Sequence, residues 1–478
     1  MTIKALSSAF DRARHSGVAG RFALSLFIAA LLIGGPALMP FSADGTVFAQ
    51  DKKKKGKDKA PMEGRKTQAL SKKVYEIITE ANELVDAENY SAALKLLDKA
   101  KAMPKLSPYE TAQLYSFYGF LYFNAERYNE AIKAYNTVLA QPDLPVPLQQ
   151  QTIRTLSQLA FVTEDYQAAI KYANQYLNDV GPDADMYVVI GTANYQLERY
   201  KDILPPVNKA IDMYREKGKG PKEQWLLLLR VAYWELNDFK NVKNILEQLV
   251  VGWPKKEYWT QLSGVYFELK DEPRQLAAYQ AAYDQGLLAS SAELTQMAQL
   301  FMQAEVPYKG AKVLEKGLAE GNVENNERNL RLLSQAWQLA QEDRKAIPPL
   351  KEAAAMSDDG DLYARLAQSY LNLSEYKSCI DSSNKGINKG GLKNTGNAYL
   401  VLGMCQFETK KLKSAKASFR KALKYKKVAQ YATSWISYVE NEETRLLQLE
   451  QSLQKAKGEE EPAEPADGEA ADAEPVAS

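Results

Sequence analysis

The sequence has little of what most enzyme sites require. It contains a single histidine, His15, and only two cysteines in 478 residues. Histidine is a common catalytic base and the commonest metal ligand, and His15 lies close to the N-terminus. A Ser–His–Asp or Cys–His arrangement would depend on that one residue. No glycine-rich loop has phosphate-binding spacing. The sequence therefore predicts no enzyme, cofactor site or metal site.

An excess of charge of either sign is also missing. The chain has 61 Lys and Arg residues against 60 Asp and Glu, a net charge of +1. Dedicated nucleic-acid binders carry a basic excess, so no nucleic-acid partner is expected. The 45% of hydrophobic residues is sufficient for a large core.

Residues 1–49 have the pattern of a secretory signal. Arg12, Arg14 and Arg21 accompany the apolar segment 22–35, and cleavage is expected after Ala49. The prediction is export to the periplasm. An uncleaved N-terminal anchor is the alternative, although the apolar segment is short for a membrane-spanning helix. Cleavage would change the net charge to +1 − 2 = −1 and remove the only histidine.

Small residues recur through the chain at intervals of about 35 residues, which indicates an internal repeat. We number each repeat from this reference residue. A large residue often follows at +3, a small one or a substitute at +12, and an apolar one at +16, so each repeat predicts two helices. The ten reference residues are Ala81, Gly119, Ser157, Gly191, Arg230, Ser263, Ala298, Ser334, Ala367 and Gly403.

The physical role of the small residues follows from helix packing. Small side chains at the reference and +12 positions allow two helix backbones to approach closely. One helical hairpin cannot bury its own apolar faces, so successive hairpins must stack.

The pattern resembles the tetratricopeptide repeat, most closely in "YSFYGFLYFNAERYNEAIKAYNTVLAQP" and "YLVLGMCQFETKKLKSAKASFRKAL". The resemblance implies an all-α, right-handed superhelical solenoid of about ten repeats over residues 74–426. Arg230, Val242 and Cys379 depart from the usual small residues. The segment "EVPYKGA" (305–311) is expected to be displaced by one residue.

Three further segments lie outside the array. Residues 427–457 predict a capping helix with Trp435, Val439, Leu446, Leu449 and Leu453 on one face, or alternatively a coiled-coil contact. Residues 50–73 predict a disordered basic linker, which is either a spacer or a contact for an anionic membrane surface or acidic partner. Residues 458–478 predict a disordered acidic tail.

The resemblance also implies a concave surface lined by the first helix of each repeat. Aromatic side chains there would suit peptide recognition, and the alternative is that they pack against neighbouring repeats. The candidate groove residues are Phe123, Phe161, Tyr195, Trp234, Phe267, Met302 and Phe407 at +4, and Arg154 at another groove position.

Cys379 and Cys405 lie in adjacent repeats. An oxidising compartment favours a disulfide between them, and the alternative is a pair of buried free thiols.

These observations predict a periplasmic, non-enzymatic adaptor that binds proteins of the cell envelope. The segment 252–288, with "LEKGLAEG" and "NKGGLKN", resembles periplasmic tetratricopeptide proteins that accompany TonB–ExbB–ExbD systems. That resemblance implies a role in energy-dependent outer-membrane uptake of iron chelates. The alternatives are a scaffold for envelope assembly, secretion or polysaccharide export and, more remotely, an enzyme with an unrecognised site.

Overall fold

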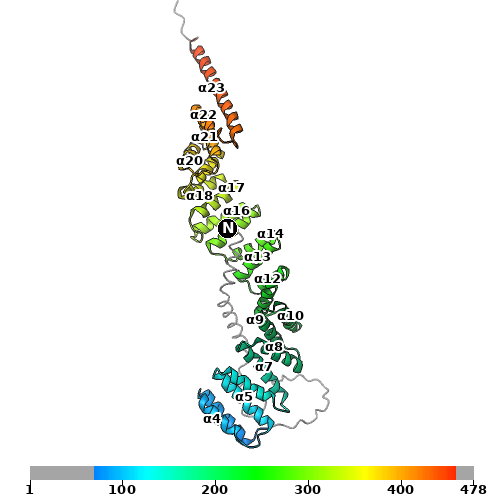
Figure 1. Ribbon diagram of the computed structural model, residues 1–478. Helices are drawn as coiled ribbons and strands as arrows, with labels where there is room; N and C mark the ends of the chain where they lie inside the picture. Colours follow the sequence, from blue (N-terminus) through cyan, green and yellow to red (C-terminus); the bar gives the residue numbers. More distant parts are fainter. Residues whose placement is uncertain (1–68, 459–478) are drawn as a thin grey trace, which may run out of the picture. The chain divides into compact units, whose positions relative to one another are not determined.

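The computed structural model describes residues 69–458 (Figure 1). This part of the chain forms 21 helices and no strand, so the predicted all-α solenoid of helical hairpins is confirmed. The signal segment, almost all of the basic linker and the acidic tail lie outside the described residues.

The helices alternate as the first and second members of ten hairpins. The first helices are α3 (Lys72–Asp86), α5 (Pro108–Asn124), α7 (Val146–Val162), α9 (Ala184–Gln196), α11 (Glu223–Glu235), α13 (Lys256–Glu268), α15 (Ser291–Gln303), α17 (Glu327–Leu339), α19 (Asp361–Asn372) and α21 (Thr395–Glu408). The second helices are α4 (Tyr90–Lys101), α6 (Tyr128–Leu139), α8 (Tyr166–Asp179), α10 (Tyr200–Glu216), α12 (Phe239–Gly252), α14 (Glu272–Asp284), α16 (Pro307–Ala319), α18 (Asp343–Met356), α20 (Tyr376–Lys389) and α22 (Leu412–Ala422). A final helix, α23 (Ala429–Gly458), follows.

The chain divides into two compact units at residues 254 and 255. Repeats 1 to 5, from the Ala81 repeat to the Arg230 repeat, make up the helical part of the first unit. Repeats 6 to 10, from the Ser263 repeat to the Gly403 repeat, lie with α23 in the second unit.

The ten repeats share one register, including the segment where we expected a displacement. Gly310 lies at +12 from Ala298, and a Cβ atom on Gly310 would lie 2.7 Å from the Ala298 carbonyl oxygen. The displacement expected in 305–311 is therefore wrong, because the absent side chain at Gly310 is what lets α16 approach α15. In repeat 5, Val242 is fully buried at +12 and Arg230 is half-buried at the reference position.

The turn inside each hairpin depends on one left-handed residue. In all ten repeats the residue at +7 has a positive φ, and none of the ten is glycine. In repeat 2, Glu126 has φ 58°, and the N–H of Arg127 donates to the carbonyl of Tyr122 at 2.8 Å. This bond satisfies a carbonyl at the helix end, as in a Schellman motif. It ends the first helix and fixes where the second begins.

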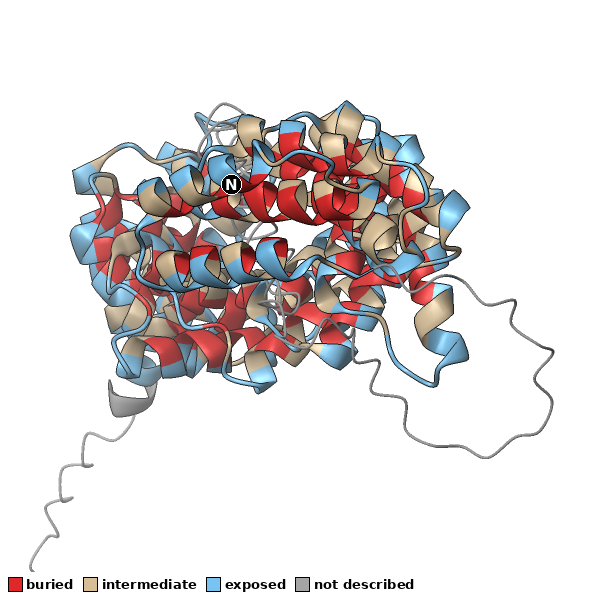
Figure 2. Cartoon of the chain, turned by 90° about the horizontal axis from the view of Figure 1, so that it is seen from below, coloured by how far each residue is buried: buried red, intermediate tan, exposed pale blue. Residues whose placement is uncertain are grey.

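The core continues from one hairpin to the next. Trp337, at +3 in repeat 8, is almost fully buried and packs in one cluster with Ala298 and Leu314 of repeat 7. Figure 2 shows buried residues on the helix faces that meet neighbours, while the connecting turns are largely exposed. The large side chains thus fill the space between hairpins.

A disulfide joins Cys379 of α20 to Cys405 of α21, and both residues are fully buried. The bond links repeat 9 to repeat 10 across a sequence separation of 26 residues.

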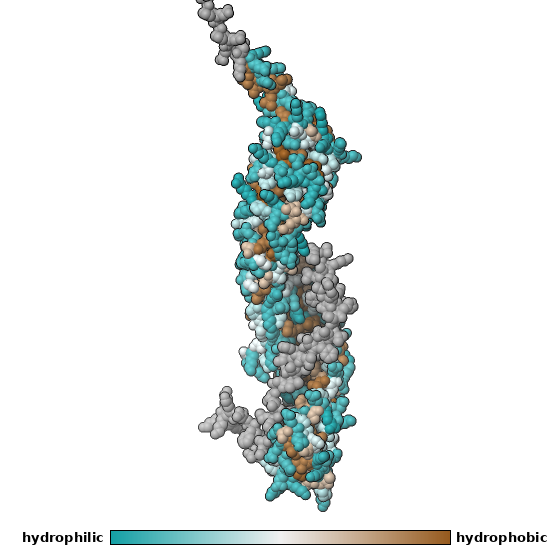
Figure 3. All heavy atoms as spheres, turned by 90° about the vertical axis from the view of Figure 1, so that its left-hand side faces the viewer, coloured by the Kyte–Doolittle hydropathy of each residue, from teal (hydrophilic) through white to brown (hydrophobic). Residues whose placement is uncertain are grey.

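Helix α23 covers the last repeat with its first half only. Val439 is fully buried, and the Trp435 ring stacks on Phe419 with 5.5 Å between centroids. Farther along, Leu449 and Leu453 are 48% and 55% exposed. Figure 3 shows apolar residues exposed on this projecting part of the helix. Of the five residues expected to cap the array, Trp435 and Val439 therefore make the contact with the last repeat.

The close approach at Gly310 gives a stability test. We expect Gly310→Val to lower the free energy of unfolding by about 1–3 kcal/mol, because the new side chain must push α15 and α16 apart. Gly264→Val is the matched control, since a Cβ atom there meets nothing within 4 Å. Urea denaturation followed by circular dichroism measures both variants. Equal stability of the two would contradict the close-approach explanation.

The disulfide gives a second test. Replacing Cys379 and Cys405 together by alanine should reduce stability by about 3 kcal/mol, because the open chain gains conformational freedom when unfolded. Reduction of the native protein should have a similar effect in the same urea titration. Adding reductant to the double variant is the control and should change nothing.

Candidate functional site

Three of the six aromatic groove candidates pack within their own hairpins. Rings at +4 meet the ring at +9, the first residue of the second helix, in an edge-on arrangement. The centroid distances are 5.8 Å for Phe123–Tyr128, 5.2 Å for Phe161–Tyr166 and 5.5 Å for Trp234–Phe239. These contacts favour the alternative in which the rings have a packing role.

The remaining +4 candidates differ in exposure. Phe407 is buried, with its ring 5.7 Å from Trp435 and 5.1 Å from Tyr438 of α23. Tyr195 and Met302 are half-buried, whereas Phe267 is 45% exposed. The candidates therefore do not present an equally exposed aromatic row.

Arg154 makes contacts between hairpins. Its Nη2 atom donates to Asp183 Oδ2 at 2.7 Å and to the Tyr176 hydroxyl at 3.1 Å. Burial alone would lower the pKa of Arg154, but Tyr176 and Asp183 raise it. Asp183 also accepts the N–H of Met186 and caps α9. Arg154 therefore ties α7 to α8 and to the start of the next repeat.

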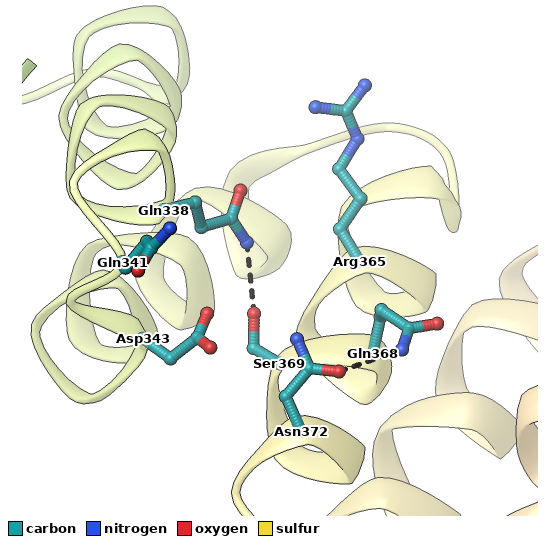
Figure 4. Close-up of a pocket in the computed structure, with 7 residues that line it drawn as sticks. All are labelled: Gln338, Gln341, Asp343, Arg365, Gln368, Ser369 and Asn372. Carbon is teal, nitrogen blue, oxygen red and sulfur yellow. Dashed lines mark hydrogen bonds between the residues drawn. The ribbon is translucent and has the colours of Figure 1, made fainter.

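The second unit contains a polar hollow of about 760 Å³ between repeats 8 and 9 (Figure 4). Four of its residues, in α17, α19 and the turn after α17, carry side-chain amides. The lining residues are Gln338, Gln341, Asp343, Arg365, Gln368, Ser369 and Asn372.

Two hydrogen bonds orient the amides. Gln338 Nε2 donates to Ser369 Oγ at 2.9 Å, and Gln368 Nε2 donates to Asn372 Oδ1 at 3.0 Å. Each carboxamide has two donor hydrogens and an accepting oxygen, so Gln338 and Asn372 retain donors and acceptors for a ligand. Figure 4 shows the Arg365 guanidinium pointing away from the amides. The hollow can therefore satisfy both N–H and C=O groups without requiring a charged ligand.

This hollow was missed in the sequence, although a signal for it was present. Gln338 lies at +4 in repeat 8, the position at which the search selected aromatic residues, and Gln368 and Asn372 lie at +1 and +5 in repeat 9. The signal was the presence of side-chain amides in the first helices of two adjacent repeats.

Residues 69–458 contain no helix that combines the length and apolarity needed to cross a membrane. The same region has no group of three or more His, Cys, Asp and Glu residues arranged to hold a metal ion.

Comparisons with known structures returned distant matches. A tetratricopeptide repeat protein from Parabacteroides merdae is 15% identical, with a TM-score of 0.33, covering 56% of this chain and 99% of its own. YrrB, described as a tetratricopeptide protein with an unusual peptide-binding site, is 13% identical with a TM-score of 0.34, covering 40% and 97%. A complex of the yeast Sti1 TPR2AB domain with pHSP90 is 16% identical with a TM-score of 0.23, covering 61% and 98%. Comparison with curated protein sequences gave no match.

Family profiles identify the repeats directly. Residues 78–145 and 396–428 each match a profile described as the tetratricopeptide repeat. The two matched segments lie in different units, and the residue with positive φ at +7 is common to all ten hairpins. The chain therefore contains tetratricopeptide repeats.

Proposed function

We propose that the chain is an adaptor that binds an extended peptide segment of another protein in the hollow between repeats 8 and 9. The observation that carries this proposal is the amide lining, in which Gln338, Gln368 and Asn372 come from the first helices of two adjacent repeats. A peptide main chain alternates donors and acceptors, and side-chain amides can pair with both.

The form of the hollow supports a peptide ligand over a small charged ligand. Gln341 and Asn372 are exposed, while Gln338 and Gln368 are half-buried, so the amides border solvent. A segment passing along the hollow could enter and leave without its ends being enclosed.

The expected place of action is the periplasm, on the basis of the signal pattern in residues 1–49. The partner would then be a protein of the cell envelope, and the basic segment 51–73 could rest on an anionic membrane surface. The narrower proposal is a component of a TonB–ExbB–ExbD system for iron-chelate uptake, supported by the resemblance of residues 252–288. A scaffold for envelope assembly, secretion or polysaccharide export is the second candidate.

A photocrosslinking experiment tests the hollow. A photoreactive amino acid in place of Gln368 should capture the partner in living cells, whereas the same residue in place of Lys351, which is exposed on α18, should not. Gln338→Ala with Asn372→Ala should weaken binding of the captured segment about 10- to 30-fold, because each lost hydrogen bond contributes about 1 kcal/mol. Fluorescence titration with the captured segment measures this change.

The outcomes separate the alternatives. Capture of a TonB, ExbB or ExbD component would support the narrower proposal, and capture of an export or assembly protein would support the second. Equal capture from Lys351, or unchanged affinity of the double variant with normal helicity, would reject the hollow as the binding site.

The location has its own test. Osmotic shock should release the protein, and mass spectrometry of the released chain should show an N-terminus at Gln50. A cytosolic protein that retains residues 1–49 would contradict export. A membrane-bound protein that retains them would support the uncleaved anchor.

A further inference from the structure

The last repeat carries a strongly basic segment. Residues 410–427 contain eight lysines and Arg420 and no acidic residue, although the whole chain is almost neutral. The segment comprises α22 with its flanking turns. Such a concentration of one sign of charge is unfavourable unless carboxylates or other anions lie nearby.

Two lysines of this segment form ion pairs with carboxylates of the next helix, α23. Lys416 Nζ lies 2.9 Å from Glu440 and 3.2 Å from Glu443. Lys410 Nζ lies 3.4 Å from Glu442. The two helices therefore already meet through pairs between basic residues of 410–427 and acidic residues later in the chain.

The other cations of this segment remain exposed. Six of them form no ion pair with any described residue, and we call them the basic surface. A seventh, Lys421, lies 5.3 Å over the Tyr399 ring. The members of the basic surface are Lys411, Lys413, Arg420, Lys424, Lys426 and Lys427. Since only Arg420 of these lies in the last turn of α22, the helix dipole does not account for the group.

The complementary charge follows directly after α23. Residues 459–478 contain eight acidic residues and no basic residue. Glu459, Glu460 and Glu461 come first, and Asp467, Glu469, Asp472 and Glu474 lie farther along.

The distances allow these residues to reach the basic surface. Gly458 lies 16 residues beyond Glu442, or about 24 Å along a helix. Asp467 lies nine residues beyond Gly458, and a random coil of that length has an r.m.s. span of about 16 Å and a full extension of about 30 Å. The 16 residues to Glu474 give about 22 Å and about 53 Å. A tether whose r.m.s. length matches the span gives its highest effective concentration, in the millimolar range.

We propose that residues 459–478 bind the basic surface of the same chain. Asp467 and the carboxylates after it pair with Lys411, Lys413 and Arg420, and full extension of the segment brings Asp472 and Glu474 to Lys424–Lys427. The occupant is assigned to this chain because its charge is opposite, its tether fits the distance, and α23 carboxylates already pair with Lys410 and Lys416. Any other polyanion must displace it to reach the basic surface.

The test is carbodiimide crosslinking of the full chain, which joins lysines to carboxylates in direct contact. Peptide mapping should find links from Lys411, Lys413 or Lys424 to Asp467, Glu469, Asp472 or Glu474. The links should largely disappear at about 1 M salt, where charges are screened within about 3 Å. Lys413→Glu, Arg420→Glu and Lys424→Glu together should reduce the remaining links at least about 10-fold, because attraction becomes repulsion.

The control variant reverses three exposed cations elsewhere in the second unit, Arg328, Lys351 and Lys377, and should keep the links. Helical circular dichroism verifies that both variants fold. Absence of the links in the unmodified chain, or their persistence after reversal of the basic surface, would overturn the proposal. In a mixture of labelled and unlabelled protein, links found only between different chains, and none within one chain, would also overturn it. If the crosslinks are absent and the full chain sediments with phosphatidylglycerol vesicles, the basic surface binds a membrane instead.

Discussion

The structure depends on the close approach of two helices at the reference and +12 positions of each repeat. At Ala298 and Gly310 the backbone of one helix fills the space that a Cβ atom on the other would need. Gly119 and Tyr135 show the related contact at +16, where the tyrosine ring lies over the glycine. Nine of the ten reference positions hold Ala, Gly or Ser, which allow this approach, whereas repeat 5 closes around Arg230 and Val242.

This constraint explains how much of the fold could be predicted. The spacing of small residues was sufficient to place ten hairpins and to relate Gly119 to Ala131. It did not reveal the left-handed +7 residue, since Glu126, Lys270 and Lys410 carry no composition signal for that conformation. The turn is determined by hydrogen bonds at the end of the first helix. The error at 305–311 arose because Gly310 was not recognised as the small residue that faces Ala298.

The candidate site was less accessible from the sequence. A position in a repeat identifies the face of the helix, but it does not identify what that side chain meets. Phe123 and Trp234 find partners on their own second helices, and Phe407 is covered by α23. Gln338 occupies the same repeat position without such a partner ring and instead orients toward Ser369. The distinction depends on neighbours that are five, 28 or 31 residues away in the chain.

The disulfide has a consequence for the order in which the array can open. Stacked repeats lose structure by fraying from a free end, because an end hairpin has only one neighbour. Cys379 belongs to the same hairpin as Gln368 and Asn372, and Cys405 belongs to the next one. Unfolding that starts at α23 therefore reaches the Cys379–Cys405 disulfide before it reaches the hollow lined by side-chain amides. We expect repeats 9 and 10 to unfold together, as one cooperative unit, before the hollow is disrupted.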